Sequence, residues 1–328
     1  MQGITIAEIG EFGLIQRIQS ILCKPEPDVL VGLGDDAATF QPKNTPIVVT
    51  TDAMVEDVHF RLEWTTAERL VQKVLVSCLS DLAVKVAKPA HAVITIGLPG
   101  SAYVDWVETF YRSLAAKANQ WQTQIIGGDT VASEKLWISI TAWGYQTTPN
   151  PIGIQAAKPG CKILVTGYLG NATKGLKLLK NNAHKDSMSH HYLINRFSCP
   201  TPRLHEAIQI VVCVIPSTMT DISDGISRDL RKVCEASHVG AHIESKRLPI
   251  SAALQDVFKD EAAGMAWQGG EDYELLLTLS PINADTLLSN WDQSDCPLTV
   301  IGEMKQKDYG IVVDGLDQSQ LKGFDHFI

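Results

Sequence analysis

The chain has 328 residues, of which 45% are hydrophobic and 20% are charged, a balance that excludes a disordered, collagen-like or coiled-coil protein. Its length predicts two domains, each large enough to bury a core of its own. The formal net charge of −9 disfavours nucleic acid as a partner, and no apolar run approaches the length that would cross a membrane.

Helices and strands are predicted to alternate along the first half of the chain. Apolar residues at helical spacing predict helices over residues 12–22, 65–85 and 104–118. Short apolar runs predict strands over 29–31, 47–50, 91–98, 123–126 and 136–145. The stretch from Gln146 to Pro159 is polar and rich in proline, so we expect a domain boundary there, with domains over 1–148 and 149–328.

The second half repeats this alternation. Helices are predicted over 172–180, 202–214, 227–236 and 282–291, and strands over 162–166, 219–222, 241–244, 274–279, 298–301 and 310–313. The polar stretch 181–191 is expected to be a loop. The whole pattern predicts a mixed α/β (α+β) protein, in which sheets and helices form two domains.

Seven cysteines are present, which is an odd number, and no two of them form a C-x-x-C pair. This pattern argues against a zinc site or a disulfide framework and favours a reducing cytoplasm. The first residues carry Glu8 and Glu11 and no basic stretch, so they do not resemble a signal peptide.

Carboxylates recur beside apolar segments, and they are the most informative feature of the sequence. A carboxylate in an apolar setting is costly unless a cation or a hydrogen-bond donor satisfies it. Few lysines or arginines are near enough in sequence to do so, and Mg²⁺ prefers oxygen ligands and bridges carboxylates to phosphates. The candidates are Asp36, Asp52, Asp81, Asp129, Asp221 and Asp224, with oxygen atoms of Thr50, Thr51 and Ser223 beside them.

Each of these acids also has an ordinary interpretation. Gly-Asp-Asp at 34–36 and Asp129 after two glycines are typical of turns, and Asp81 could face solvent from its helix. The segment that begins at Asp221 does not fit a calcium loop, because Gly225 falls at loop position five and Lys232 at position twelve. No P-loop, G-x-G-x-x-G or protein-kinase motif occurs, so a bound nucleotide would be held by another scheme.

Taken together, the motifs resemble those of the thiamine-monophosphate kinase family, and the resemblance spans nearly the whole chain. The resemblance rests above all on Gly34-Asp35-Asp36-Ala37, Thr50-Thr51-Asp52, Leu79-Ser80-Asp81-Leu82-Ala83, Gly127-Gly128-Asp129-Thr130, Asp221-Ile222-Ser223-Asp224-Gly225 and Gly269-Gly270-Glu271-Asp272-Tyr273-Glu274-Leu275.

That resemblance implies a homodimer in which N-terminal sheets form a barrel, with ATP bound in the cleft between the N-terminal and C-terminal domains. It implies Mg²⁺-assisted transfer of the γ-phosphoryl group of ATP to thiamine monophosphate. The implied metal ligands are Asp36, Thr50, Thr51, Asp52, Asp81, Asp129, Asp221 and Asp224. Gly128, Asp129 and Ser223 would contact ATP, and His59, Glu271 and Phe324 would contact thiamine monophosphate.

The chain departs from the family pattern in two places. Ile154 occupies the position where the family usually has an arginine that contacts ATP, and Lys158 or Lys174 are the candidate replacements. Around Asp81, Cys78 replaces an asparagine and Val86 replaces a glycine. Two other functions therefore stay open: another ATP-dependent synthetase of the same fold group, and a catalytically silent protein that binds a nucleotide or a divalent ion.

Overall fold

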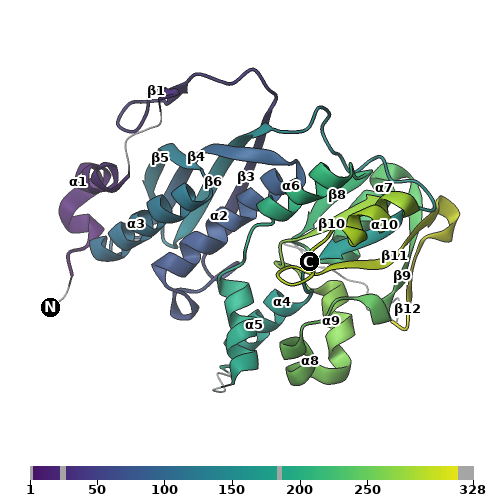
Figure 1. The fold of residues 1–328 in the computed structure, drawn as a ribbon. Helices are drawn as coiled ribbons and strands as arrows, with labels where there is room; N and C mark the ends of the chain where they lie inside the picture. The colour runs from purple at the N-terminus through teal and green to yellow at the C-terminus, as the bar shows by residue number, and fades with distance from the viewer. Residues whose placement is uncertain (1–2, 23–26, 183–186, 317–328) are drawn as a thin grey trace. The chain divides into compact units, whose positions relative to one another are not determined.

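The computed structural model describes residues 3–22, 27–182 and 187–316, and the chain in it divides into two compact units (Figure 1). The first comprises residues 1–82 and 87–147, and the second comprises 83–86 and 148–328. In the described residues, no helix is both long and apolar enough to cross a membrane.

The first unit is built on a four-stranded sheet with the strand order β3-β6-β4-β5. The β4–β5 pair is parallel, and the other pairs are antiparallel. Two helices, α2 and α3, lie over one face of this sheet (Figure 1). The elements are α1 Ile6–Ile21, β1 Val29–Val31, β2 Thr39–Phe40, β3 Ile47–Val55, α2 Ala67–Val84, β4 Ala87–Leu98, α3 Val104–Gln120, β5 Gln124–Ala132 and β6 Trp137–Gln146.

The core of the first unit lies between these helices and the sheet. Apolar residues at helical spacing on α2 and α3, such as Leu75 and Phe110, are fully buried. Alternate residues of β6, such as Ile138 and Ile140, face them from the sheet. The other face of the sheet keeps exposed apolar side chains, among them Val49 on β3, which is 65% exposed.

The second unit is built on a six-stranded sheet with the order β12-β9-β11-β7-β10-β8 and with helices packed on both faces. Its inner strand β10, between β7 and β8, is buried along its whole length, as expected for a strand covered on both sides. The elements are β7 Lys162–Thr166, α4 Asn171–Lys180, α5 Met188–Ser198, α6 Leu204–Cys213, β8 Thr218–Ile222, α7 Ile226–Ser237, β9 Val239–Glu244, α8 Ala252–Phe258, α9 Ala262–Gln268, β10 Glu274–Leu279, α10 Pro281–Ser289, β11 Leu298–Gln306 and β12 Ile311–Asp314.

The structure confirms the mixed α/β prediction, corrects one predicted loop and adds two short helices. The predicted loop over 181–191 is wrong at its end, because α5 begins at Met188 with Ser187 as its cap. The hydroxyl of Ser187 accepts a hydrogen bond from the backbone N–H of His190, and this short polar cap looks like loop sequence. Helices α8 and α9 have only seven residues each, too few for a clear periodic signal.

Val86, which replaces a glycine of the family pattern, keeps the backbone conformation that glycine favours. Its φ is 50°, in the left-handed region that a glycine adopts without strain. Its side chain is only 1% exposed and belongs to a core cluster of the second unit. At this position the chain accepts backbone strain and gains a buried apolar side chain.

Candidate active site

The first group of predicted ligands lies where β3 faces α2. The residues of β3 alternate between the two faces of the sheet, and Thr50 and Asp52 point to the helix side. The Thr50 hydroxyl donates a hydrogen bond to Oδ2 of Asp81 over 2.5 Å. The long apolar helix α2 thus presents its one inward carboxylate to the middle of β3.

Asp52 and Asp81 are close enough to affect one another's ionisation. Burial, followed by the nearby charge of Asp81, raises the pKa of Asp52 from 3.8 to about 6. Burial and the same two carboxylates also raise the pKa of the Cys78 thiol, which is fully buried between them and the sheet. Two like charges in a partly buried place favour a divalent cation, which would remove the repulsion.

The side chain of Thr51 does not lie beside Asp52 and Asp81. Its side chain lies on the opposite face of the sheet, where its hydroxyl donates to the Ile140 carbonyl over 3.1 Å and lies 2.9 Å from the Thr141 hydroxyl. It could reach an ion held by Asp52 only through its backbone.

The second group lines a cavity of about 720 Å³ in the first unit. Asp35 and Asp36 come from the segment after β1, and Gly128 and Asp129 come from β5, so two motifs more than ninety positions apart in sequence line the same cavity. The rest of the wall is largely apolar and includes Phe12, Ile15 and Ile18 of α1 with Tyr111 of α3. Burial, followed by the charge of Asp129, raises the pKa of Tyr111.

Gly128 of β5 is needed for strand pairing. The predicted strand ended at Ile126, but β5 continues through Gly127, Gly128 and Asp129 to Ala132. A Cβ on Gly128 would lie 2.0 Å from the carbonyl oxygen of Ile94 on β4, so only glycine allows this approach. Asp129 is therefore a strand residue and not a turn residue.

One metal ion cannot serve both groups. Asp52 pairs with Ile140, Ile140 with Ile94, and Ile94 with Gly128, so Asp52 and Gly128 lie in one row on opposite edge strands. Three strand spacings separate them by about 14 Å. Among the described residues, no three His, Cys, Asp or Glu side chains gather as a ready-made metal site. Mg²⁺ commonly takes only one or two carboxylates beside substrate phosphates, and both groups fit that pattern.

His59 lies in the turn that follows β3. Its Nδ1 accepts a hydrogen bond from the backbone N–H of Val55 over 3.0 Å, so this nitrogen carries no proton. The Nζ of Lys73 donates to the backbone carbonyl of His59 over 3.3 Å. These contacts fix the orientation of the imidazole ring.

In the second unit, the predicted residues of two motifs lie next to each other. The backbone N–H of Glu271 donates to the Ser223 carbonyl over 2.7 Å, and Leu275 of β10 pairs with Asp221 of β8. A Cβ on Gly270 would lie 2.5 Å from that same carbonyl oxygen. Glu271 itself has a φ of 63°, a strained conformation that persists only when its surroundings impose it.

Two buried acids, to which the sequence motif assigned no role, hold this strained segment. Asp272 accepts hydrogen bonds from the backbone N–H groups of Gly170 and Ala172 at the start of α4, over 2.5 and 3.0 Å. Burial nevertheless raises its pKa to about 7. Glu274 is fully buried and pairs with Arg203 at 2.6 Å and with Arg196 at 3.0 Å. The two arginines are 71 and 78 residues away in sequence, so no local signal reveals these pairs.

Asp224, a predicted metal ligand, pairs with a lysine of its own unit. Its Oδ2 accepts a hydrogen bond from Nζ of Lys232 over 2.8 Å, and Lys232 also contacts the buried Asp229 at 3.0 Å. A metal ion at Asp224 would therefore compete with an ammonium group.

The missing arginine near Ile154 is not replaced by Lys174. Ile154 packs against a core cluster of the second unit. Lys174 is only 2% exposed, and its Nζ lies 4.4 Å from the centre of the Phe258 ring. Burial, followed by the charge of Lys177, lowers the pKa of Lys174 to about 8. Lys158 is exposed and stays a candidate. Phe324 lies outside the described residues.

Comparisons with known proteins give a consistent result. Residues 34–146 match the family model described as AIR synthase related protein, N-terminal domain, and residues 158–315 match that of the C-terminal domain. The chain is 36% identical to the thiamine-monophosphate kinase of Salmonella typhimurium, over 97% of this chain and 98% of the relative. It also resembles the crystal structure of thiamine-monophosphate kinase from Stenotrophomonas maltophilia K279a, with a TM-score of 0.82, 35% identity, and coverage of 94% of this chain and 97% of that one. A structure of AaThiL complexed with AMPPCP and TMP matches over 100% of both chains, with a TM-score of 0.78 and 29% identity.

Proposed function

Because the chain belongs to the thiamine-monophosphate kinase family of AIR synthase related proteins, we propose that it transfers the γ-phosphoryl group of ATP to thiamine monophosphate. The products are thiamine diphosphate and ADP. The observation that supports this most directly is the cavity in which Asp36, Gly128 and Asp129 meet. A relative of full-length similarity has been solved with AMPPCP, an ATP analogue, and TMP.

The cavity of the first unit is the proposed ATP site. Its volume of about 720 Å³ suits a nucleotide, and its apolar wall from α1 offers a surface for the base. The backbone N–H groups of the glycine-rich strand can approach phosphate oxygens closely. Gly128 and Asp129 are assigned to ATP here, and Ser223 contributes from the second unit.

Mg²⁺ ions are assigned to the carboxylates, where they would neutralise the charge between donor and acceptor phosphates. Asp52 and Asp81, with Thr50, would hold one ion, and Asp36 and Asp129 would hold another. Asp221 and Asp224 are the proposed ligands from the second unit, and Thr51 would take part through its backbone. Several ions are needed, because one row of the sheet separates the first two groups by about 14 Å.

The chain's own residues mainly position the two substrates. The acceptor phosphate is already largely deprotonated near neutral pH, so no strong general base is required. His59 is held in one orientation by Val55 and is assigned to thiamine monophosphate. Glu271 would provide a negative charge for the cationic thiazolium ring, and Phe324 a ring for stacking.

We also propose that the chain acts as a homodimer whose N-terminal sheets form a barrel. The uncovered face of the first sheet carries Ile47 at 44% and Val49 at 65% exposure. In the described residues, the edge strands β3 and β5 each pair on one side only. An apolar face between two open edges is a liability that a second sheet would remove. In this proposal residues 1–148 bind ATP and Mg²⁺ and dimerise, and residues 149–328 complete the reaction site. A cytoplasmic location stays a prediction from the cysteine pattern.

The test is a direct product assay. The purified protein is incubated with ATP, Mg²⁺ and thiamine monophosphate, and the mixture is analysed by mass spectrometry. We expect thiamine diphosphate and ADP in equal amounts, and Asp52→Ala should abolish both while the far-UV circular dichroism spectrum is unchanged. ADP without thiamine diphosphate would point to another ATP-dependent enzyme of this fold group. Neither product would indicate a silent binding protein.

A further inference from the structure

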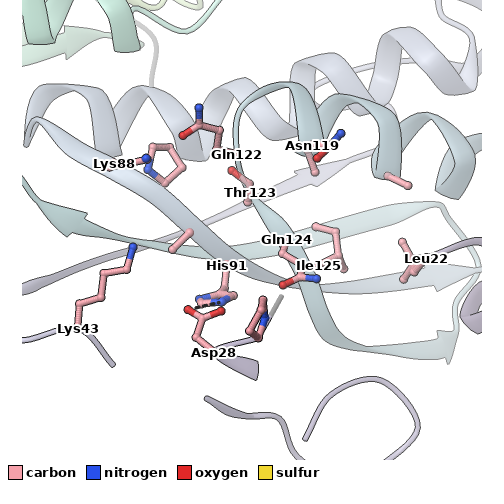
Figure 2. A pocket seen from close by; sticks show the side chains of 15 residues that line it. Leu22, Asp28, Lys43, Lys88, His91, Asn119, Gln122, Thr123, Gln124 and Ile125 are labelled. Atoms are coloured by element: carbon pink, nitrogen blue, oxygen red, sulfur yellow. Dashed lines mark ion pairs between the residues drawn. The ribbon is translucent and has the colours of Figure 1, made fainter. Parts of the chain in front are cut away.

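A second cavity of about 640 Å³ lies in the first unit, and no residue assigned to the kinase reaction lines it (Figure 2). Its walls come from residues 22, 27–28 and 43, the start of β4, the end of α3 and the start of β5. Leu22 lines both cavities, and β5 runs from Gln124 and Ile125 in this one to Ile126 in the other.

A buried histidine forms one side of this cavity. His91 is 2% exposed, and its Nε2 lies 3.6 Å from Oδ2 of Asp28, as the dashed line in Figure 2 marks. Its ring packs against Phe40 and Trp143, with centroid distances of 5.0 and 5.7 Å. The kinase reaction does not use this fixed imidazole–carboxylate pair.

The cavity is locally cationic in a chain of net charge −9. Lys43 and Lys88 line it, and Asp28, whose Oδ2 lies 3.6 Å from Nε2 of His91, is the one acid among the described lining residues. Both lysines belong to the same neighbourhood, because Nζ of Lys43 lies 4.9 Å from the centre of the Tyr145 ring and Lys88 pairs with Tyr145 across β4 and β6. Two lysines that line one concave site favour an anion, and a dianion above all.

The other polar side chains of the cavity can hydrogen-bond to the uncharged polar part of a ligand. Asn119, Gln122 and Gln124 bring carboxamides, each of which can donate and accept hydrogen bonds. Gln122 has a φ of 54° just after the end of α3, a position where glycine would be unstrained. Glycine would leave this place in the cavity empty, whereas Gln122 fills it with a carboxamide.

We propose that this cavity is a binding site for a small phosphate monoester. Its phosphate faces Lys43 and Lys88, and its hydroxyl or amide groups meet the carboxamides of Asn119, Gln122 and Gln124. The volume is within the range of small-molecule sites. The inference does not depend on the proposed kinase activity.

The test is calorimetric titration of the full chain with glycerol 3-phosphate, in EDTA so that metal-held phosphate sites do not contribute. We expect saturable binding with one site per chain, and a shift of the His91 ring resonances in the NMR spectrum at the same concentrations. Lys43→Ala and Lys88→Ala should each weaken binding by about tenfold. Lys135→Ala, which removes an exposed lysine that pairs with Asp57 outside the cavity, should leave it unchanged.

Three results would overturn the proposal. The first is the absence of saturable binding, and the second is equal binding by the wild-type chain and the Lys43→Ala/Lys88→Ala double variant. The third is equal binding of glycerate and glycerol 3-phosphate, because a carboxylate would then suffice and the site would not select a phosphate.

Discussion

Asp52→Asn should make the metal-free protein more stable at neutral pH while it removes kinase activity. In the folded protein, burial and Asp81 raise the pKa of Asp52 from 3.8 to about 6. The folded state therefore keeps a proton that the unfolded chain has already lost, and stability falls as pH rises from about 4 to about 6. A shift of this size corresponds to about 3 kcal/mol in the free energy of unfolding at pH 7. Asparagine carries no charge and avoids this cost.

The assay is urea unfolding in EDTA, followed by tryptophan fluorescence at several pH values between 4 and 7. The variant and the wild-type chain should have similar stability at pH 4, and the variant should gain up to about 3 kcal/mol by pH 7. Mg²⁺ should stabilise the wild-type chain more than the variant, because the cation offsets the same repulsion. The matched control is Asp57→Asn, at an exposed acid whose pKa the hydrogen bond from Lys135 lowers. This control should show no gain at pH 7. A variant-to-wild-type difference that is constant across pH would refute the electrostatic reasoning.

Further predictions follow from close contacts and exposed surface. Gly128→Ala should lower the free energy of unfolding by about 2–3 kcal/mol in urea titrations and abolish turnover, because its Cβ would meet a carbonyl oxygen at 2.0 Å. Gly127→Ala, whose Cβ would meet a side-chain methyl group at 3.4 Å, should cost under about 1 kcal/mol, and equal losses would contradict the reasoning. At position 86, Val86→Gly should be more stable to urea than Val86→Ala by about 0.5–1 kcal/mol, the reverse of the usual order, because only glycine relieves the left-handed backbone. Val49→Asp should shift the sedimentation coefficient from dimer to monomer, while Val58→Asp, at an exposed apolar residue outside the sheet face, should not; a dimer that survives Val49→Asp would exclude this interface.

The sequence predicted the order of elements well, because most helices and strands here have one clear apolar period. It failed where the signal was short or polar, as at α5, which begins within the expected loop. It also ended three strands, β3, β5 and β11, several residues too early. The polar residues Thr51 and Asp52 lie inside β3, and Gly128 and Asp129 lie inside β5. Polar or glycine residues in mid-strand look like a strand end until the neighbouring strand is known.

In the candidate site, too, some contacts could be predicted from local sequence and others could not. Asp81 was a candidate ligand that could instead have faced solvent, and its hydrogen bond with Thr50 shows that it faces the sheet. By contrast, no local pattern indicated that Asp224 pairs with Lys232, or that Arg203 and Arg196 neutralise Glu274. Such pairs depend on where helices cross the sheet, and spacing along one element does not encode this.

Asp272 has a mechanical consequence for the second unit. It adjoins Glu271 in sequence, and its carboxylate is tied to the two amides that open α4. A displacement of that helix end would therefore pull on Glu271 through two hydrogen bonds and one peptide link. The start of α4 and Glu271 are therefore expected to move together, and loss of the Asp272 hydrogen bonds would let each move without the other.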